Sequence, residues 1–95
     1  MTHPFRFALA ASTVTNGPDF VEVAKKAEDL GYSAIAIADH LDNQLAPLIA
    51  LTGAAMATTT LRLNSLVLCN DYRHPGMVAK EAATLDQLSG GRLEL

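Results

Sequence analysis

The chain has 95 residues, of which 49% are hydrophobic and 18% charged, and its formal net charge at pH 7 is -3. This composition is typical of one small globular domain, and the scattered Lys and Arg argue against a nucleic-acid surface. No apolar run reaches the ~18 residues of a membrane-spanning helix. The single cysteine, Cys69, excludes an internal disulfide and fits a reducing, cytoplasmic location.

The first two predicted elements are a strand at about residues 5–10 and a helix at about 19–30. The strand is a short run rich in Phe and Leu. In the helix, apolar residues recur at i, i+3, i+4 and i+7. Asp19 and Glu22 have the spacing of a capping box, and Gly31 is placed to end the helix with a positive φ.

The next three elements are a strand over 34–39, a helix over 46–59 and a strand over 62–69. The segment "SAIAIAD" has no polar alternation, which is typical of a parallel strand covered on both faces. The second helix carries Pro47 in its first turn, where proline is favoured.

The last two elements are a helix over 75–89 and a strand over 92–95. Pro75 suits the start of the helix, and the preceding His74 is expected to help start it. Gly90-Gly91 form its stop. One apolar stripe is expected along this helix, made of Val78, Ala82, Leu85 and Leu88.

The resulting βαβαβαβ order predicts an α/β fold with a parallel sheet. Two architectures fit it: an open doubly wound sheet, or the N-terminal portion of a (β/α)₈ TIM barrel, whose full length is about 250 residues. The loop after the first strand lacks the G-x-G-x-x-G pattern of dinucleotide-binding folds, which disfavours the open sheet.

Polar residues gather where the predicted strands end. Asp39 and His40 follow the second strand, Cys69 and Asn70 close the third, and Ser12 lies just past the first. Ligands bind at this carboxyl rim in both architectures. His40 is suited to proton transfer near neutral pH but could equally be a plain loop residue. Asp39 could simply cap a turn.

Two other kinds of site are disfavoured. A Cys69–His40 nucleophile dyad has no specific support, because buried cysteines are usually inert. A metal site from Asp39, His40, Cys69 and His74 is weak, because adjacent residues in a strand point to opposite faces.

Three stretches resemble the luciferase-like flavin monooxygenase superfamily. They are "AEDLGYSAIAIADHL", "DNQLAPLIALTGAAMATTTLRL" and "NDYRHPGMVAKEAATLDQLSGGRLEL", and together they cover nearly the whole chain. The likeness is greatest to the oxidoreductases of that superfamily that use the deazaflavin coenzyme F420. It implies that residues 1–95 are the N-terminal part of the barrel domain, with strands one to four and helices one to three.

The resemblance also implies a cofactor site at the carboxyl rim. His40 matches a histidine beside the reacting face of the cofactor that serves in proton transfer, and Asp39 matches a residue that contacts the deazaflavin. A non-proline cis peptide that walls the cofactor in relatives maps onto Leu66-Val67. Cys69, with Asn70 beside it, occupies a cofactor position where relatives can carry a hydroxyl, so only a backbone contact is expected from it.

The implied chemistry is hydride transfer between coenzyme F420 and a small-molecule substrate. An alternative is an FMN-dependent flavin monooxygenase component. A second alternative is a truncated, catalytically inactive barrel fragment that self-associates. Without strands five to eight, the isolated chain is expected to leave inner-face aliphatic residues uncovered, to form homo-oligomers and to bind no cofactor tightly. The residues expected to divide between the two faces are Leu9, Ile35, Ile37, Leu66 and Leu68.

Overall fold

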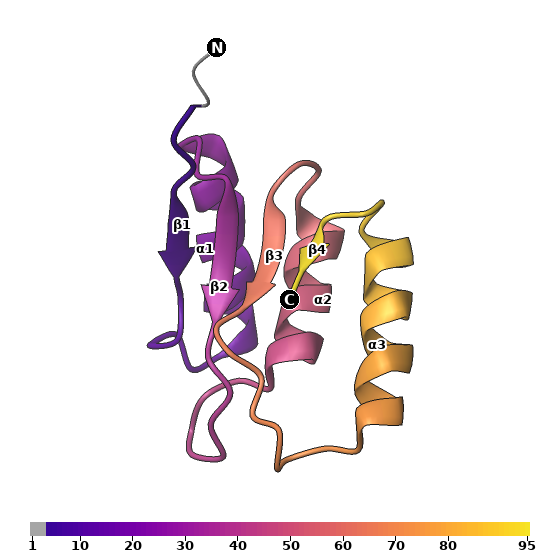
Figure 1. Cartoon of the computed structure of the whole chain (residues 1–95). Helices are drawn as coiled ribbons and strands as arrows, with labels where there is room; N and C mark the ends of the chain where they lie inside the picture. Colours follow the sequence, from indigo (N-terminus) through magenta and orange to yellow (C-terminus); the bar gives the residue numbers. More distant parts are fainter. Residues whose placement is uncertain (1–3) are drawn as a thin grey trace.

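The computed structural model describes residues 4–95, in which strands and helices alternate strictly (Figure 1). This alternation confirms the predicted βαβαβαβ order. The elements are β1 (Ala8–Ala10), α1 (Gly17–Asp29), β2 (Ala34–Ile37), α2 (Pro47–Ala57), β3 (Arg62–Ser65), α3 (Pro75–Leu88) and β4 (Leu93–Glu94). None of the helices in this part of the chain combines the length and apolar character that crossing a membrane requires.

The sheet has the order β1-β2-β3-β4, and all three pairings are parallel, as predicted. Each crossover therefore steps in the same direction, and right-handed crossovers of this kind place their helices on one face of the sheet. Figure 1 shows α1 and α2 behind the strands and α3 beside α2, past the edge of the sheet. A doubly wound sheet would reverse its strand order. The arrangement is that of the N-terminal portion of a (β/α)₈ barrel.

The core lies between the sheet and these helices. The register aligns Leu9, Ile35, Leu63 and Leu93 in one row across the four strands. Ile35 and Leu63 are fully buried, and each contributes about 1.5–3 kcal/mol through burial of its side chain. The helices supply the other half of this core, chiefly through Phe20, Ala24, Leu51, Ala54 and Leu85.

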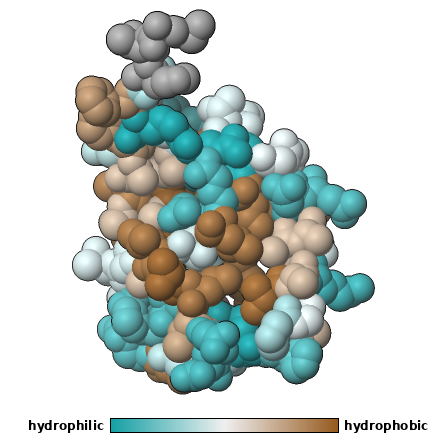
Figure 2. All heavy atoms as spheres, in the orientation of Figure 1, coloured by the Kyte–Doolittle hydropathy of each residue, from teal (hydrophilic) through white to brown (hydrophobic). Residues whose placement is uncertain are grey.

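The opposite face of the sheet carries small and polar side chains. Strand alternation places Arg62, Asn64 and Glu94 there, next to alanines of β1 and β2. Glu94 accepts hydrogen bonds from Arg6, at 2.6 Å, and from Arg62. Hydrogen bonding from Arg6, joined by Arg62, holds the pKa of the Glu94 carboxyl below its ordinary range. Figure 2 shows this face, with hydrophilic atoms above and a hydrophobic region across the middle.

This alternation corrects one expectation. Burial on both faces, expected for "SAIAIAD", is confirmed in β2, whereas exposure alternates along β3, so the expected loss of cover for aliphatic residues is smaller than predicted. Among the aliphatic residues expected to lose partners, Ile35 and Ile37 are buried, Leu9 and Leu68 are partly buried, and only Leu66, 57% exposed, is largely uncovered. The reason is that the helices cover the face on which the large aliphatic residues lie.

The strands are shorter than predicted, because β1 and β3 pair with β2 only along its four residues. Ala8 lies opposite Ala34, the first residue of β2, so the residues before it have no strand beside them. At the other end, side chains replace strand neighbours as hydrogen-bond acceptors. Ser12 Oγ accepts from the N–H of Ala38 at 2.9 Å, and Asp39 accepts from the N–H of Cys69.

The helix termini confirm part of the prediction and correct part of it. The N-cap of α1 is Asn16, whose side chain accepts from the N–H of Asp19, so Asp19 lies in the first turn and does not cap the helix. Gly31 has the predicted positive φ, 89°. His74 starts α3 as expected, since its Nδ1 accepts from the N–H of Gly76 at 2.9 Å.

The apolar stripe predicted along α3 is only partly buried. Leu85 is buried, Val78 and Ala82 are half-buried, and Leu88 is 52% exposed. The cause is position, because α3 stands at the end of the row of helices and packs on α2 from one side only (Figure 1).

Two opposite charges hold the connection between α2 and β3. The Glu28 carboxylate accepts from the backbone N–H groups of Thr59, Thr60 and Leu61 at 2.7–3.2 Å. The buried Arg92 guanidinium donates on the other side of the same segment, and its acceptors are the carbonyls of Ala55, Thr58, Leu61 and Ser89 and the Thr58 hydroxyl. This segment is therefore tied to α1 and to β4 at once.

Glu28→Gln is expected to destabilise the chain and to flatten the pH dependence of its stability. Partial burial raises the pKa of Glu28, but hydrogen bonds from Thr60, Leu61 and Thr59 outweigh it and lower the pKa from 4.5 to about 2. A depressed folded-state pKa adds stability that is present above pH 4.5 and is lost as the pH falls toward 2. At pH 7 the substitution should cost about 1–3 kcal/mol, because it removes charge-assisted hydrogen bonds.

The measurement is urea unfolding between pH 7 and pH 2 at fixed protein concentration. Glu22→Gln is the matched control, since Glu22 is exposed and, among residues 4–95, forms its one ion pair with Lys25 on the same helix. It should change stability by less than about 1 kcal/mol. Equal effects of the two substitutions would contradict this role of Glu28.

Candidate functional site

The carboxyl ends of β1, β2 and β3 meet at one edge of the sheet, as predicted. The hydrogen bond from Ala38 to Ser12 joins the ends of β1 and β2. The backbone N–H of Leu66 donates to the carbonyl of Ile37 at 2.8 Å and keeps β3 against β2 one residue beyond the ladder. Beyond this point each of the three strands continues into a loop, and these loops carry the candidate residues.

Asp39 is the buried charge of this rim. It is 6% exposed and lies two residues past the end of β2. Arg73 binds its carboxylate through two nitrogens, with Nη1 2.5 Å from Oδ2 and Nη2 3.0 Å from Oδ1. The backbone N–H of Cys69 donates to the same Oδ2 at 2.7 Å. Three donors thus satisfy a charge that would otherwise be costly to bury.

These partners set the protonation state of Asp39. Hydrogen bonding from Arg73 holds the pKa of the Asp39 carboxyl below its ordinary range, against burial, which raises it; the Cys69 N–H adds to the lowering. Asp39 is therefore an anionic acceptor at neutral pH and has no proton to donate. Its expected contact with a deazaflavin stays a prediction.

His40 lies at the rim with an exposed side chain. Within residues 4–95 its imidazole takes part in none of the side-chain hydrogen bonds or ion pairs. Both ring nitrogens are therefore available to a ligand. Asp39 and His40 are neighbours in sequence, yet one is fixed inside the protein and the other faces solvent.

The loop after β3 contributes the exposed apolar side chains of Leu66 and Val67 to the rim, and we call this pair the wall. Leu66-Val67 is a non-proline cis peptide, as the resemblance implies, and the two side chains are 57% and 68% exposed. Cys69 is half-buried and tied to Asp39 through its backbone, and Asn70 is exposed. The structure thus brings Asp39 and Cys69 together and leaves His40 and Asn70 unattached.

Arg73 is the residue of this site that the sequence reasoning missed. Its side chain is 23% exposed, and it comes from the loop just before α3. One signal could have found it, because a buried Asp at the end of a strand requires a cationic or N–H partner. Choosing among the seven basic residues, however, requires the register of the strands.

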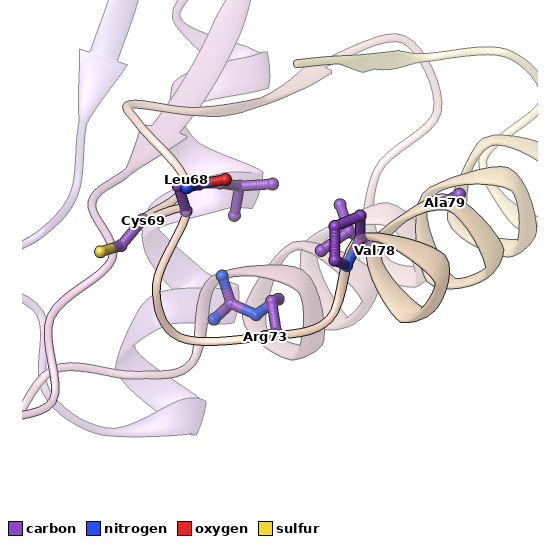
Figure 3. A pocket seen from close by; sticks show the side chains of 7 residues that line it. Leu68, Cys69, Arg73, Val78 and Ala79 are labelled. Carbon is purple, nitrogen blue, oxygen red and sulfur yellow. The ribbon is translucent and has the colours of Figure 1, made fainter.

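A hollow of about 320 Å³ lies between this loop and the first turn of α3 (Figure 3). Figure 3 shows Leu68 extending toward α3 and the Cys69 sulfur pointing away from it. The residues that line the hollow are Leu68, Cys69, Asn70, Arg73, Pro75, Val78 and Ala79. Over residues 4–95 no group of three His, Cys, Asp or Glu side chains is placed to hold a metal ion.

Comparison with known proteins identifies relatives over the full chain. The sequence model of the family described as luciferase-like monooxygenase matches residues 1–95. The F420-dependent glucose-6-phosphate dehydrogenase of Microbacterium testaceum is 33% identical over 104 residues, which cover 100% of this chain and 31% of that protein. The chain thus spans about a third of the length of this curated relative.

Solved structures share the fold. The coenzyme F420 dependent tetrahydromethanopterin reductase from Methanopyrus kandleri has a TM-score of 0.85 and 32% identity, over 93% of this chain and 25% of that one. The oxygenating constituent of 3,6-diketocamphane monooxygenase from Pseudomonas putida, in complex with FMN, has a TM-score of 0.84 over 95% of this chain and 28% of that one. Its identity is 18%, so this likeness concerns the fold alone.

Proposed function

The chain belongs to the luciferase-like monooxygenase family, and we propose on that basis that it forms the N-terminal part of a cytoplasmic oxidoreductase that transfers hydride between coenzyme F420 and a small-molecule substrate. The observation that carries the proposal is the exposed imidazole of His40, without a hydrogen-bond partner in the described residues, beside the rim that Asp39 and Cys69 fix. Two relatives above 30% identity are F420-dependent by name, which favours this coenzyme.

The residues present suit a flat, redox-active ring. Leu66 and Val67 offer an exposed apolar wall at the rim, and Asn70 adds an exposed amide. The deazaflavin would supply the hydride-transfer centre when bound. His40 would hold or move a proton at the reacting ring or substrate, while Asp39 and Cys69 keep the wall in place.

FMN is the second candidate cofactor. The fold likeness to an FMN-bound oxygenating enzyme supports it, and both coenzymes present a planar tricyclic ring. In that case the protein would be a flavin monooxygenase component, and the same wall and histidine would face the ring.

We further propose that the isolated chain forms homo-oligomers and is inactive alone. Within residues 4–95, β1 and β4 each have a neighbouring strand on one side only, and unpaired strand edges promote association. Leu66 and Val67 at the rim and Ile49, Met77 and Leu88 on the helices add exposed apolar surface.

His40→Ala is expected to lower turnover far more than stability in a barrel that contains this segment together with strands five to eight. An exposed rim side chain contributes little packing, whereas general acid–base catalysis typically contributes 10²–10⁴-fold to rate. Steady-state kinetics and thermal unfolding measure the two effects. Asn43→Ala, in the same exposed loop, is the control and should keep its activity. Full turnover in His40→Ala would refute the role.

Titration of the same complete barrel with F420 and with FMN, followed by visible absorbance, should show preference for F420. The expected ratio of dissociation constants is at least about tenfold, which corresponds to 1.4 kcal/mol. Tighter binding of FMN would support the monooxygenase alternative, and binding of neither would count against both.

Light scattering of the isolated 95-residue chain should give a mass above the 10.1 kDa of one copy. Unpaired strand edges and exposed apolar side chains are the physical reason. Dilution should lower the mass if the association is reversible. A cooperative monomer that binds F420 or FMN at micromolar concentration would show that this proposal is wrong.

A further inference from the structure

We infer that Arg73 is a positioning residue of the rim: by binding the buried Asp39 through two nitrogens, it fixes the backbone of Cys69 and with it the wall formed by Leu66-Val67. The inference rests on the proposed function in one respect, namely that this wall faces the cofactor. The geometry itself is independent of any ligand.

The first step of the argument is that Asp39 is the hub of the loop. Its carboxylate side chain is 2% exposed and receives Arg73 and the Cys69 N–H on the same oxygen, Oδ2. Arg73 and Cys69 are thereby held on one atom, although they belong to different parts of the loop between β3 and α3. Without Arg73, the part of the loop after Leu66 would be joined to the β2 end only by the hydrogen bond from the Cys69 N–H to Asp39.

The second step is that the remaining ties of this loop are weak or distant. The Leu66 N–H bonds to Ile37 at its start, and His74 caps α3 at its end. Between them, a 3.3 Å turn hydrogen bond joins the Tyr72 N–H to the Cys69 carbonyl. The middle of the loop therefore depends on Asp39 and Arg73 for its position.

The third step concerns Arg73 itself. A guanidinium binds a carboxylate with two parallel N–H donors, and an ammonium cannot reproduce that fork. Lysine at this position should restore the charge and one contact but not the fixed orientation. A merely electrostatic role would be restored fully by Arg73→Lys, whereas a positioning role is restored in part.

Cys69 provides a direct reporter, because it is the only cysteine of the chain and its N–H is the group in question. The experiment measures the rate of Cys69 alkylation by iodoacetamide and the hydrogen exchange of the Cys69 amide in the full 95-residue chain. The variants are Arg73→Gln, Arg73→Lys, Asp39→Asn and the double variant of Arg73→Gln with Asp39→Asn. Arg6→Gln is the control, since Arg6 pairs with Glu94 away from the rim.

Arg73→Gln and Asp39→Asn should each speed both processes by at least about tenfold, because each breaks the same charge-assisted pair. The double variant should be no faster than the single ones, and Arg73→Lys should lie between them and the parent chain. Arg6→Gln should leave both rates unchanged. Unchanged rates in Arg73→Gln would overturn the inference.

A general loss of structure would overturn it too, and exchange at β2 detects this. The amides of Ile35 and Ile37 should stay protected in Arg73→Gln, because local opening of the loop does not unfold the sheet. Equal loss of protection in β2 and at Cys69 would show that Arg73 supports the whole fold and does not position the rim. Slower alkylation of Cys69 by iodoacetamide when F420 is added to the complete barrel tests the proposed function separately, since the exchange rates of the 95-residue chain decide the role of Arg73 without any cofactor.

Discussion

The connection between α2 and β3 is the constraint on which the sheet depends. The Glu28 carboxylate accepts from the N–H groups of Thr59–Leu61, and Arg92, the residue before β4, donates to the carbonyls of Thr58 and Leu61. The backbone that enters β3 is therefore held from α1 and from the start of β4. This clamp determines where β3 begins between its neighbours. Leu63 then lies beside Ile35 and Leu93. At the other end of β3, Ser65 lies opposite Ile37, the last residue of β2, so the two strands reach the rim in register.

The rim is held by the same physical means as the clamp. Strand pairing ends at Ile37 and Ser65, and beyond it the buried Asp39 carboxylate accepts a hydrogen bond from a backbone N–H that has no strand partner. At the amino end a carboxylate and a guanidinium act on opposite sides of one segment, whereas at the carboxyl end Asp39 and Arg73 bind each other and a single N–H. Apolar burial thus assembles the sheet and helices, and charge-assisted hydrogen bonds fix the two edges where the chain turns.

Sequence pattern predicted the order of elements, because amphipathic periodicity is a local property. It also placed Asp39 and His40 at the rim, since the end of a buried run marks the end of a strand. It could not predict Arg73, Glu28 or Arg92 as partners of groups about thirty residues away, because those pairs depend on strand register. The N-cap is Asn16 and not Asp19 for a local reason: Pro18 is accommodated in the first turn, and the Asn16 side chain accepts from the N–H of Asp19.

The adjacent residues Asp39 and His40 differ sharply in their surroundings, and the proposed function assigns the chemistry to the exposed one. The buried carboxylate of Asp39 needs hydrogen-bond donors, and Arg73 and the Cys69 N–H supply them. Asp39 therefore holds the loop in place. The next residue, His40, is exposed and takes part in none of the side-chain hydrogen bonds of the described chain, so both of its ring nitrogens are open to a ligand. A proton-transfer group must change its protonation state during turnover, and a group that holds the fold together cannot do so without loosening it. In the proposed function, the separation of the two roles onto neighbouring residues lets Asp39 keep the rim fixed while His40 exchanges a proton with its ligand.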